Sequence, residues 1–245
     1  MPRRRYLVLC AALLMPLIIS CAEKAVAPEH PVTPLAGVET VGIVSTDGVV
    51  LSGRLFGSSN DVGVILTHMR PNDQTAWFEY AEELADEDYA VLTFDFRGYG
   101  ESPGAQDFGT LDDDLAAAVR YLHDRGKQQV LLIGASMGGT TALVVAAQAD
   151  VDGVVSISSP AEFEDQNALE AAPNITAPKL FIVSEGDEAA VLSLGELLQA
   201  TGEPKDSEIY PGNAHGTNLF LADQSEAAAA IRTRILEFLR EYARP

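Results

Sequence analysis

The stretch Val130-Leu131-Leu132-Ile133-Gly134-Ala135-Ser136-Met137-Gly138-Gly139 decides the fold. Its first four residues form an apolar run typical of a buried strand, and a helical pattern rich in small residues follows over 137–149. A G-x-S-x-G pentapeptide lies between the two, and its glycines leave room for a very tight turn. Five loosely constrained positions recur by chance, but a strand before them and a helix after them make the pattern specific. We expect this turn to lift the hydroxyl of Ser136 clear of a sheet.

Outward from this stretch, strand patterns alternate with helix patterns. Eight segments rich in apolar and β-branched residues are expected as strands: 38–45, 49–56, 62–67, 89–94, 130–133, 154–157, 180–183 and 207–210. Helices are expected over 75–86, 110–126, 137–149, 188–199 and 225–242, with Thr110 as a helix cap. Asp47-Gly48 indicates a hairpin between the first two strands. The alternation predicts an α/β fold, an eight-stranded, mostly parallel sheet flanked by helices on both faces.

The first 36 residues differ from the rest. Arg3, Arg4 and Arg5 precede an apolar run over 6–19, which has the length of a signal-peptide core and is short for a membrane span. The next residues, Ile18-Ile19-Ser20-Cys21, resemble the bacterial lipobox, which implies cleavage after Ser20 and a lipid on Cys21. An ordinary cleaved signal or an uncleaved anchor is the alternative.

Three prolines follow Cys21 and indicate an extended tether. The sequence therefore predicts a lipoprotein-type signal peptide over 1–20, a tether over 21–36 and one domain over 37–245. The lipobox resemblance implies an exported protein, anchored by lipid to the periplasmic or extracytoplasmic face of a bacterial cell envelope. Cys10 lies in the segment expected to be removed, so no disulfide is expected.

The charge balance and the missing ligand motifs argue against several classes of partner and cofactor. The 245 residues include 16 Lys and Arg against 36 Asp and Glu, a net charge of −20. A chain this acidic repels phosphate backbones, so we expect no nucleic-acid binding. No clustered ligand spacing indicates a metal site, and no glycine-rich phosphate loop indicates a nucleotide, so no metal and no cofactor are expected. Nothing in the sequence predicts an oligomeric state.

The turn around Ser136 resembles that of the α/β-hydrolase superfamily, and the chain is similar to its small serine hydrolases related to dienelactone hydrolases and serine aminopeptidases. A second segment, Asp95-Phe96-Arg97-Gly98-Tyr99-Gly100-Glu101-Ser102, resembles the D-x-R-G-x-G-x-S turn of these proteins, and we expect Asp95 and Arg97 to pair. The resemblance implies a cofactor-free serine hydrolase that acts on a small acyl ester. A cofactor-free haloperoxidase, a peptidase and a catalytically silent lipid-anchored binding protein are the alternatives.

The superfamily places its catalytic residues in the order serine, acid, histidine. His215 is the histidine that follows Ser136, since His30, His68 and His123 precede it. The acid is expected after the seventh strand. Asp187 is the first candidate and Glu185 the second, while Glu162 and Asp165, after the sixth strand, are more distant alternatives. The resemblance thus implies a triad of Ser136, Asp187 and His215.

An oxyanion formed on the substrate needs two backbone N–H donors. The resemblance assigns the first to Met137 and the second to the loop after the third strand, where either Met69 or Arg70 supplies it. Relatives usually carry His-Gly here, whereas this chain has His68-Met69, and we read His68 as structural. Arg70 either favours an anionic substrate group or pairs with one of the many acids.

The connection between the sixth and seventh strands, 160–179, has about twenty residues. That is too short for a cap domain, although one or two short helices fit. We therefore expect a fairly open site.

Overall fold

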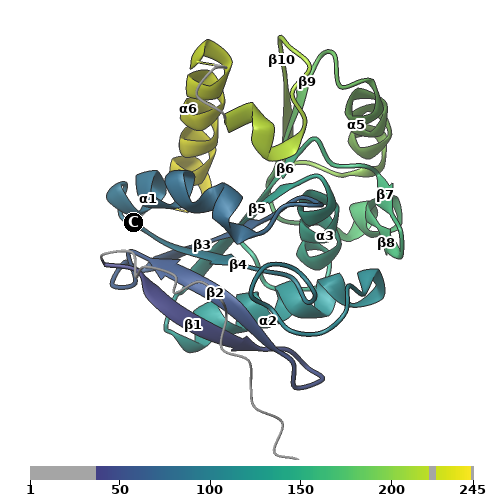
Figure 1. Cartoon of the computed structure of the whole chain (residues 1–245). Coiled ribbons are helices and arrows are strands. Elements are labelled where there is room, and N and C mark those ends of the chain that lie inside the picture. Colours follow the sequence, from purple (N-terminus) through teal and green to yellow (C-terminus); the bar gives the residue numbers. More distant parts are fainter. Residues whose placement is uncertain (1–36, 221–224, 244–245) are drawn as a thin grey trace, which may run out of the picture. The chain divides into compact units, whose positions relative to one another are not determined.

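The computed structural model of the protein describes residues 37–220 and 225–243 (Figure 1). The predicted signal peptide, Cys21 and the tether lie outside the described residues and stay predictions. Contacts divide the chain into Met1–Pro34 and Leu35–Pro245, and every element named below belongs to the second unit. Within the described ranges, no helix is both long enough and apolar enough to cross a membrane.

An eight-stranded sheet forms the centre of this unit, with its strands in the order β1-β2-β4-β3-β5-β6-β9-β10. The strands are β1 (Glu39–Val44), β2 (Val50–Phe56), β3 (Val62–Thr67), β4 (Tyr89–Phe94), β5 (Gln129–Ala135), β6 (Gly153–Ile157), β9 (Lys179–Ser184) and β10 (Lys205–Tyr210). β2 is antiparallel to both of its neighbours, and the other pairs are parallel. The predicted α/β class and the edge hairpin of β1 and β2 are confirmed.

Burial explains which strands lie in the middle. Every residue of β3, β4, β6 and β9 is buried, as expected for parallel strands covered on both faces. β10 has no fully buried residue and carries lysine, aspartate and glutamate, which suits an edge strand because charges discourage pairing with another chain.

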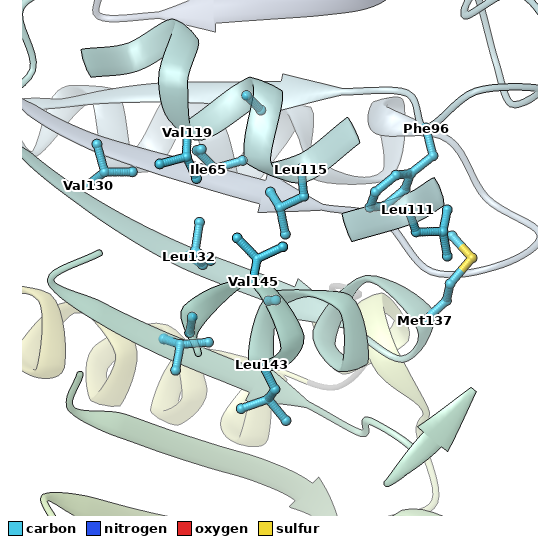
Figure 2. Packing of buried hydrophobic residues seen from close by; sticks show 14 of the residues in the cluster. Ile65, Phe96, Leu111, Leu115, Val119, Val130, Leu132, Met137, Leu143 and Val145 are labelled. Atoms are coloured by element: carbon cyan, nitrogen blue, oxygen red, sulfur yellow. The ribbon is translucent and has the colours of Figure 1, made fainter. Parts of the chain in front are cut away.

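Helices cover both faces of the sheet, as predicted. α1 (Phe78–Asp86) and α6 (Ser225–Tyr242) contribute to one apolar cluster, and α2 (Leu111–Asp124), α3 (Met137–Ala146) and α5 (Glu188–Ala200) contribute to the other. Figure 2 shows part of the second cluster, where Leu115 of α2 and Val145 of α3 lie close to Leu132 of β5. These helices fix the position of the turn between β5 and α3.

Two predicted helix starts differ in detail. The helix expected over 75–86 begins as a 3-10 turn, η1 (Gln74–Trp77), because the Asp73 carboxylate accepts from the Thr75 amide, and α1 then continues it. Thr110 does precede α2, but its hydroxyl donates to the carbonyl of Asp107 instead of capping the helix. The predicted cap is therefore wrong, since a further 3-10 turn, η2 (Phe108–Thr110), occupies this position.

The connection from β6 to β9 contains no cap domain. It holds the short helix α4 (Ala168–Ala171) and the 3-10 turn η3 (Ala172–Asn174), as expected. It also holds a small hairpin of β7 (Glu162–Phe163) and β8 (Gln166–Asn167), which the sequence did not predict. Strands of two residues leave no periodic pattern to detect.

Candidate active site

Ser136 sits at the turn between β5 and α3. Its backbone has φ 50° and ψ −119°, a conformation that residues with a side chain rarely adopt. The surroundings hold it there, since the Ser136 amide donates to the carbonyl of Ile157 at the end of β6 over 2.8 Å. The side chain is half-buried at the carboxyl edge of the sheet.

The glycines on either side make this turn possible. A Cβ on Gly134 would lie 2.4 Å from the carbonyl oxygen of Gly138. A Cβ on Gly138 would lie 2.7 Å from the carbonyl oxygens of both Thr67 and His68, in the loop after β3. No side chain fits at such distances, so the backbone of the turn packs directly against its neighbours.

His215 lies between the other two residues that the family resemblance singles out. Its Nε2 atom is 2.8 Å from the Ser136 hydroxyl oxygen, and its Nδ1 atom is 2.7 Å from Oδ2 of Asp187. With the ring proton on Nδ1, His215 donates to Asp187 and accepts from Ser136. His215 is held by the loop between β10 and the 3-10 turn η4 (Gly216–Phe220), and Asp187 directly precedes α5. The imidazole is 43% exposed and the carboxylate 11%.

The other candidate acids lie elsewhere. Glu185 has an exposed side chain, while its amide donates to the carbonyl of Tyr210. Glu162 and Asp165 are exposed residues of the β7–β8 hairpin. Asp187 is the acid that contacts His215.

Three amides are candidates to face an oxyanion, those of Met137, Met69 and Arg70. Within the described part of the chain, none of the three donates a hydrogen bond to another protein group. Met137 is also the first residue of α3, where the helix dipole favours negative charge. The choice between Met69 and Arg70 stays open.

The loop after β3 and the end of that strand contact both the turn that carries Ser136 and the segment that follows His215. The Thr67 hydroxyl donates to the carbonyl of Gly138 over 3.0 Å. The Met69 sulfur lies so close to Gly216 that a Cβ there would come within 2.5 Å of it. Asn72 Nδ2 donates to the Thr217 hydroxyl over 3.4 Å. The loop thus forms one wall of the site.

His68 is structural in its contacts. Its ring is fully buried; Nε2 accepts from the Phe96 amide over 3.2 Å, and Nδ1 donates to the carbonyl of Met69 over 3.1 Å. Burial lowers the pKa of His68 from 6.5 to about 4. The imidazole is therefore neutral, and its hydrogen bonds stabilise the loop that carries the amides of Met69 and Arg70.

The predicted pairing of Asp95 with Arg97 is wrong. Asp95 accepts hydrogen bonds from the Gln74 amide, the Gln74 side chain and the Glu101 amide, and burial raises its pKa. Arg97 points instead to α2 and forms ion pairs with Asp114 and Asp47. The two side chains leave the turn in different directions.

Arg70 pairs with no carboxylate in the described ranges, so of the two alternatives left open for it, the ion pair with an acid is not observed there. Its exposed guanidinium lies over the ring of Phe108, 5.4 Å from the ring centroid. Phe108 had no signal in the sequence, since its role depends on a contact between distant loops.

A sizeable hollow lies away from the serine. A hollow of about 390 Å³ lies beside the C-terminal end of α3 and is lined by Asp112, Gln148 and Asp165 among others, whereas Ser136 precedes the N-terminal end of that helix. No described group of three or more His, Cys, Asp or Glu side chains is arranged to hold a metal ion.

The architecture agrees with comparisons to known proteins. A model of the alpha/beta hydrolase fold matches residues 63–199, more than half of the chain. The chain belongs to the α/β hydrolase fold family. The uncharacterized protein YfhR of Escherichia coli O157:H7 is 31% identical over 128 residues, which are 49% of this chain and 45% of that protein. The chain thus spans about half the length of this curated relative.

Solved structures of α/β hydrolases share the architecture. The esterase Pf2001 of Pyrococcus furiosus superposes with a TM-score of 0.71 at 21% identity, covering 89% of this chain and 98% of that one. A dienelactone hydrolase of Anabaena variabilis superposes with a TM-score of 0.71 at 24% identity, covering 84% and 98%. At these identities the likeness shows the fold alone.

Proposed function

We propose that the protein is a serine hydrolase that cleaves acyl esters through a Ser-His-Asp triad. The position of His215, within hydrogen-bond distance of both Ser136 and Asp187, carries the proposal. A serine hydroxyl is a weak nucleophile until a base takes its proton, and a base needs a third group to hold its tautomer. These three side chains have the contacts that such a relay requires.

In the proposed reaction the Ser136 oxygen attacks the acyl carbon as its proton moves to Nε2 of His215. Asp187 accepts from Nδ1 and stabilises the imidazolium. His215 then protonates the leaving alkoxide, and an acyl-enzyme remains on Ser136. A water molecule, deprotonated by His215, attacks this ester, and the carboxylic acid leaves as the serine regains its proton.

Backbone amides stabilise the negative oxygen of each tetrahedral intermediate. The Met137 amide supplies one donor, and the amide of Met69 or Arg70 supplies the other. Fixed donors of this kind lower a barrier by about 3–4 kcal/mol when they point to the developing charge. The freedom of these amides from protein partners supports this role.

Two further features favour a small ester as substrate. His215 is nearly half exposed and the described connection from β6 to β9 holds no cap domain, which favours access of substrate to the serine from solvent. Esterases and a dienelactone hydrolase share the fold. No observation in the described residues favours the haloperoxidase, peptidase or silent-binding alternative over ester hydrolysis.

We also propose that Cys21 carries a lipid that anchors the exported enzyme to the bacterial cell envelope. The order of basic residues, apolar run and lipobox in residues 1–21 supports this location. The tether would then hold the catalytic domain above the membrane surface.

Hydrolysis of 4-nitrophenyl esters, from acetate to octanoate, tests the enzymatic proposal. Wild type is expected to hydrolyse the short esters, and Ser136→Ala to lose at least about 10³-fold in kcat/KM. Ser158→Ala is the matched control, because Ser158 also has φ 50° and follows the neighbouring strand β6, yet its hydroxyl has no hydrogen-bond partner. Halogenation with halide and peroxide but no ester hydrolysis would favour the haloperoxidase instead.

A further inference from the structure

Arg70 lies on the wall of the candidate site. Met69, directly before it, packs against Gly216, and Asn72, two residues after it, donates to Thr217. Gly216 directly follows His215. The backbone of Arg70 is therefore held beside the triad, and its side chain extends from this wall of the site.

The guanidinium extends from there to an aromatic wall. It lies over Phe108, and Phe108 meets Phe163 of β7 edge-on, with ring centroids 5.4 Å apart and planes at 90°. A cation over an aromatic face is attracted by the ring quadrupole, so Phe108 favours this position of the guanidinium. Arg70 is thus preorganised although it is exposed.

The turn η2, which carries Phe108, leads into α2, and α2 packs against α3, which begins directly after Ser136. Phe108 stands three residues before Leu111, and Figure 2 shows Leu111 beside Met137, the residue after Ser136. The Tyr99 hydroxyl lies 3.7 Å from the Met137 sulfur. Burial raises the pKa of Tyr99, and the nearby charge of Arg70 opposes that rise. The Arg70 charge is therefore within electrostatic reach of the residues around Ser136.

In the described ranges, no ion pair neutralises the charge of Arg70. Six arginines in the described ranges form an ion pair with Asp or Glu, namely Arg54, Arg97, Arg125, Arg232, Arg234 and Arg240. Arg70 and Arg120 have none there, and Arg120 lies on the exposed side of α2. In a chain of net charge −20, an arginine without an ion pair in the described ranges, on the loop that contacts the segment after His215, is available for a ligand anion.

We propose that Arg70, held over Phe108, binds a carboxylate carried by the ester substrate, so that the enzyme prefers esters with one anionic end. The proposal rests on the function proposed above and names its substrate class. A guanidinium offers parallel N–H donors that match a carboxylate, and such charged hydrogen bonds are stronger than neutral ones. The protein's own negative charge repels anions, so a local cation at the site is needed to bind one.

Two matched pairs of esters test this preference and report which end carries the charge. Mono-4-nitrophenyl succinate places a carboxylate on the acyl side, and 4-acetoxybenzoate places one on the leaving group. The methyl ester at that carboxylate gives the neutral partner of each. For each pair, the ratio of kcat/KM for the anionic ester to kcat/KM for its neutral partner is measured. For at least one pair, Arg70→Ala is expected to lower this ratio about fivefold to tenfold.

Arg70→Lys is expected to fall between wild type and Arg70→Ala, since lysine keeps the charge but lacks the parallel N–H donors that match a carboxylate. Arg120→Ala removes the same charge far from the triad and is expected to leave both ratios unchanged. Ratios equal to those of wild type in Arg70→Ala, or an equal fall in Arg120→Ala, would overturn the subsite.

A binding measurement separates this proposal from the catalytic one. Isothermal titration of Ser136→Ala with 4-acetoxybenzoate and with mono-4-nitrophenyl succinate needs no turnover. For at least one of the two, Arg70→Ala in the same background is expected to weaken binding about fivefold relative to its neutral partner. If the esters bind in this Arg70-dependent way but wild type does not hydrolyse them, the catalytic proposal fails and the subsite stands. If hydrolysis occurs without any dependence on Arg70, the subsite fails alone.

Discussion

Thr67 donates its hydroxyl hydrogen bond to the carbonyl of Gly138 over 3.0 Å, which ties the loop after β3 to the turn that carries Ser136. The two segments approach so closely that the backbones are in contact. The position of the candidate oxyanion amides relative to the serine depends on this contact.

Gly138→Ala is expected to destabilise the protein by about 2–4 kcal/mol and to reduce ester hydrolysis, because its Cβ would overlap the carbonyls of Thr67 and His68. Gly195→Ala in α5 is the control. A Cβ there meets nothing within 4 Å, so alanine is expected to stabilise the helix by about 0.5–1 kcal/mol. Urea unfolding measures both changes. Similar effects at the two positions would contradict the close packing of the turn.

The buried ion pair of Arg97 with Asp114 predicts a second stability effect. Asp114 is fully buried and accepts hydrogen bonds from three donor groups of Arg97, its amide, Nε and one terminal nitrogen. Asp114→Asn leaves the arginine with a weaker partner and is expected to cost about 3 kcal/mol in the free energy of unfolding. Asp113→Asn removes the same charge from the same helix turn at an exposed position, and it is expected to change stability by less than about 0.5 kcal/mol. Equal losses would mean that the ion pair contributes nothing specific.

His68 predicts a pH dependence of stability. Its pKa is about 4 in the folded protein, against an ordinary value of 6.5. Below pH 6.5 the unfolded chain binds a proton that the folded protein does not. The free energy of unfolding therefore falls as the pH drops from 6.5 to 4, by about 3 kcal/mol in total. Above pH 6.5 this residue adds no pH dependence.

Urea unfolding of wild type and His68→Gln between pH 7 and pH 4.5 checks this prediction, with a shallower slope expected for the variant. Nitrogen chemical shifts of the imidazole provide a second check that does not require the variant to fold. At pH 5.5 they should report a neutral ring protonated on Nδ1. A charged His68 at that pH would contradict the burial argument.

The proposed anchor predicts that wild type incorporates radiolabelled palmitate and sediments with the bacterial membrane. Cys21→Ala should remain unacylated and appear in the soluble fraction. Cys10→Ala lies in the segment expected to be removed and should behave as wild type. Membrane retention of unlabelled Cys21→Ala would overturn the lipoprotein proposal in favour of an uncleaved anchor.

Local patterns were sufficient to predict the sheet. Long apolar runs such as β3 and β4 and the helical spacing of Leu115, Val119 and Leu122 depend on neighbours in sequence, so alternation alone indicated the architecture. The order of serine, acid and histidine that the family resemblance implies selected His215 and made Asp187 the first of several candidate acids, and the structure brings both into contact with each other.

Contacts between distant segments left no such signal. Asp95 and Arg97 stand two residues apart, yet each takes partners from other elements, Gln74 for the first and Asp114 for the second. The contact of the Arg70 guanidinium with the Phe108 ring likewise joins two segments that are distant in sequence. The sequence contains many Asp and Glu residues, and its charge pattern does not indicate which of them pairs with a given arginine.

Reaction with a fluorophosphonate probe tests the central claim most directly, because the probe phosphonylates only a serine that a base has activated. Mass spectrometry of the digested protein is predicted to find a single adduct on Ser136. Ser136→Ala should show no adduct, His215→Gln should react far more slowly, and Ser158→Ala should react as wild type. A folded wild-type protein that stays unlabelled, or a label that persists in Ser136→Ala, would contradict the account.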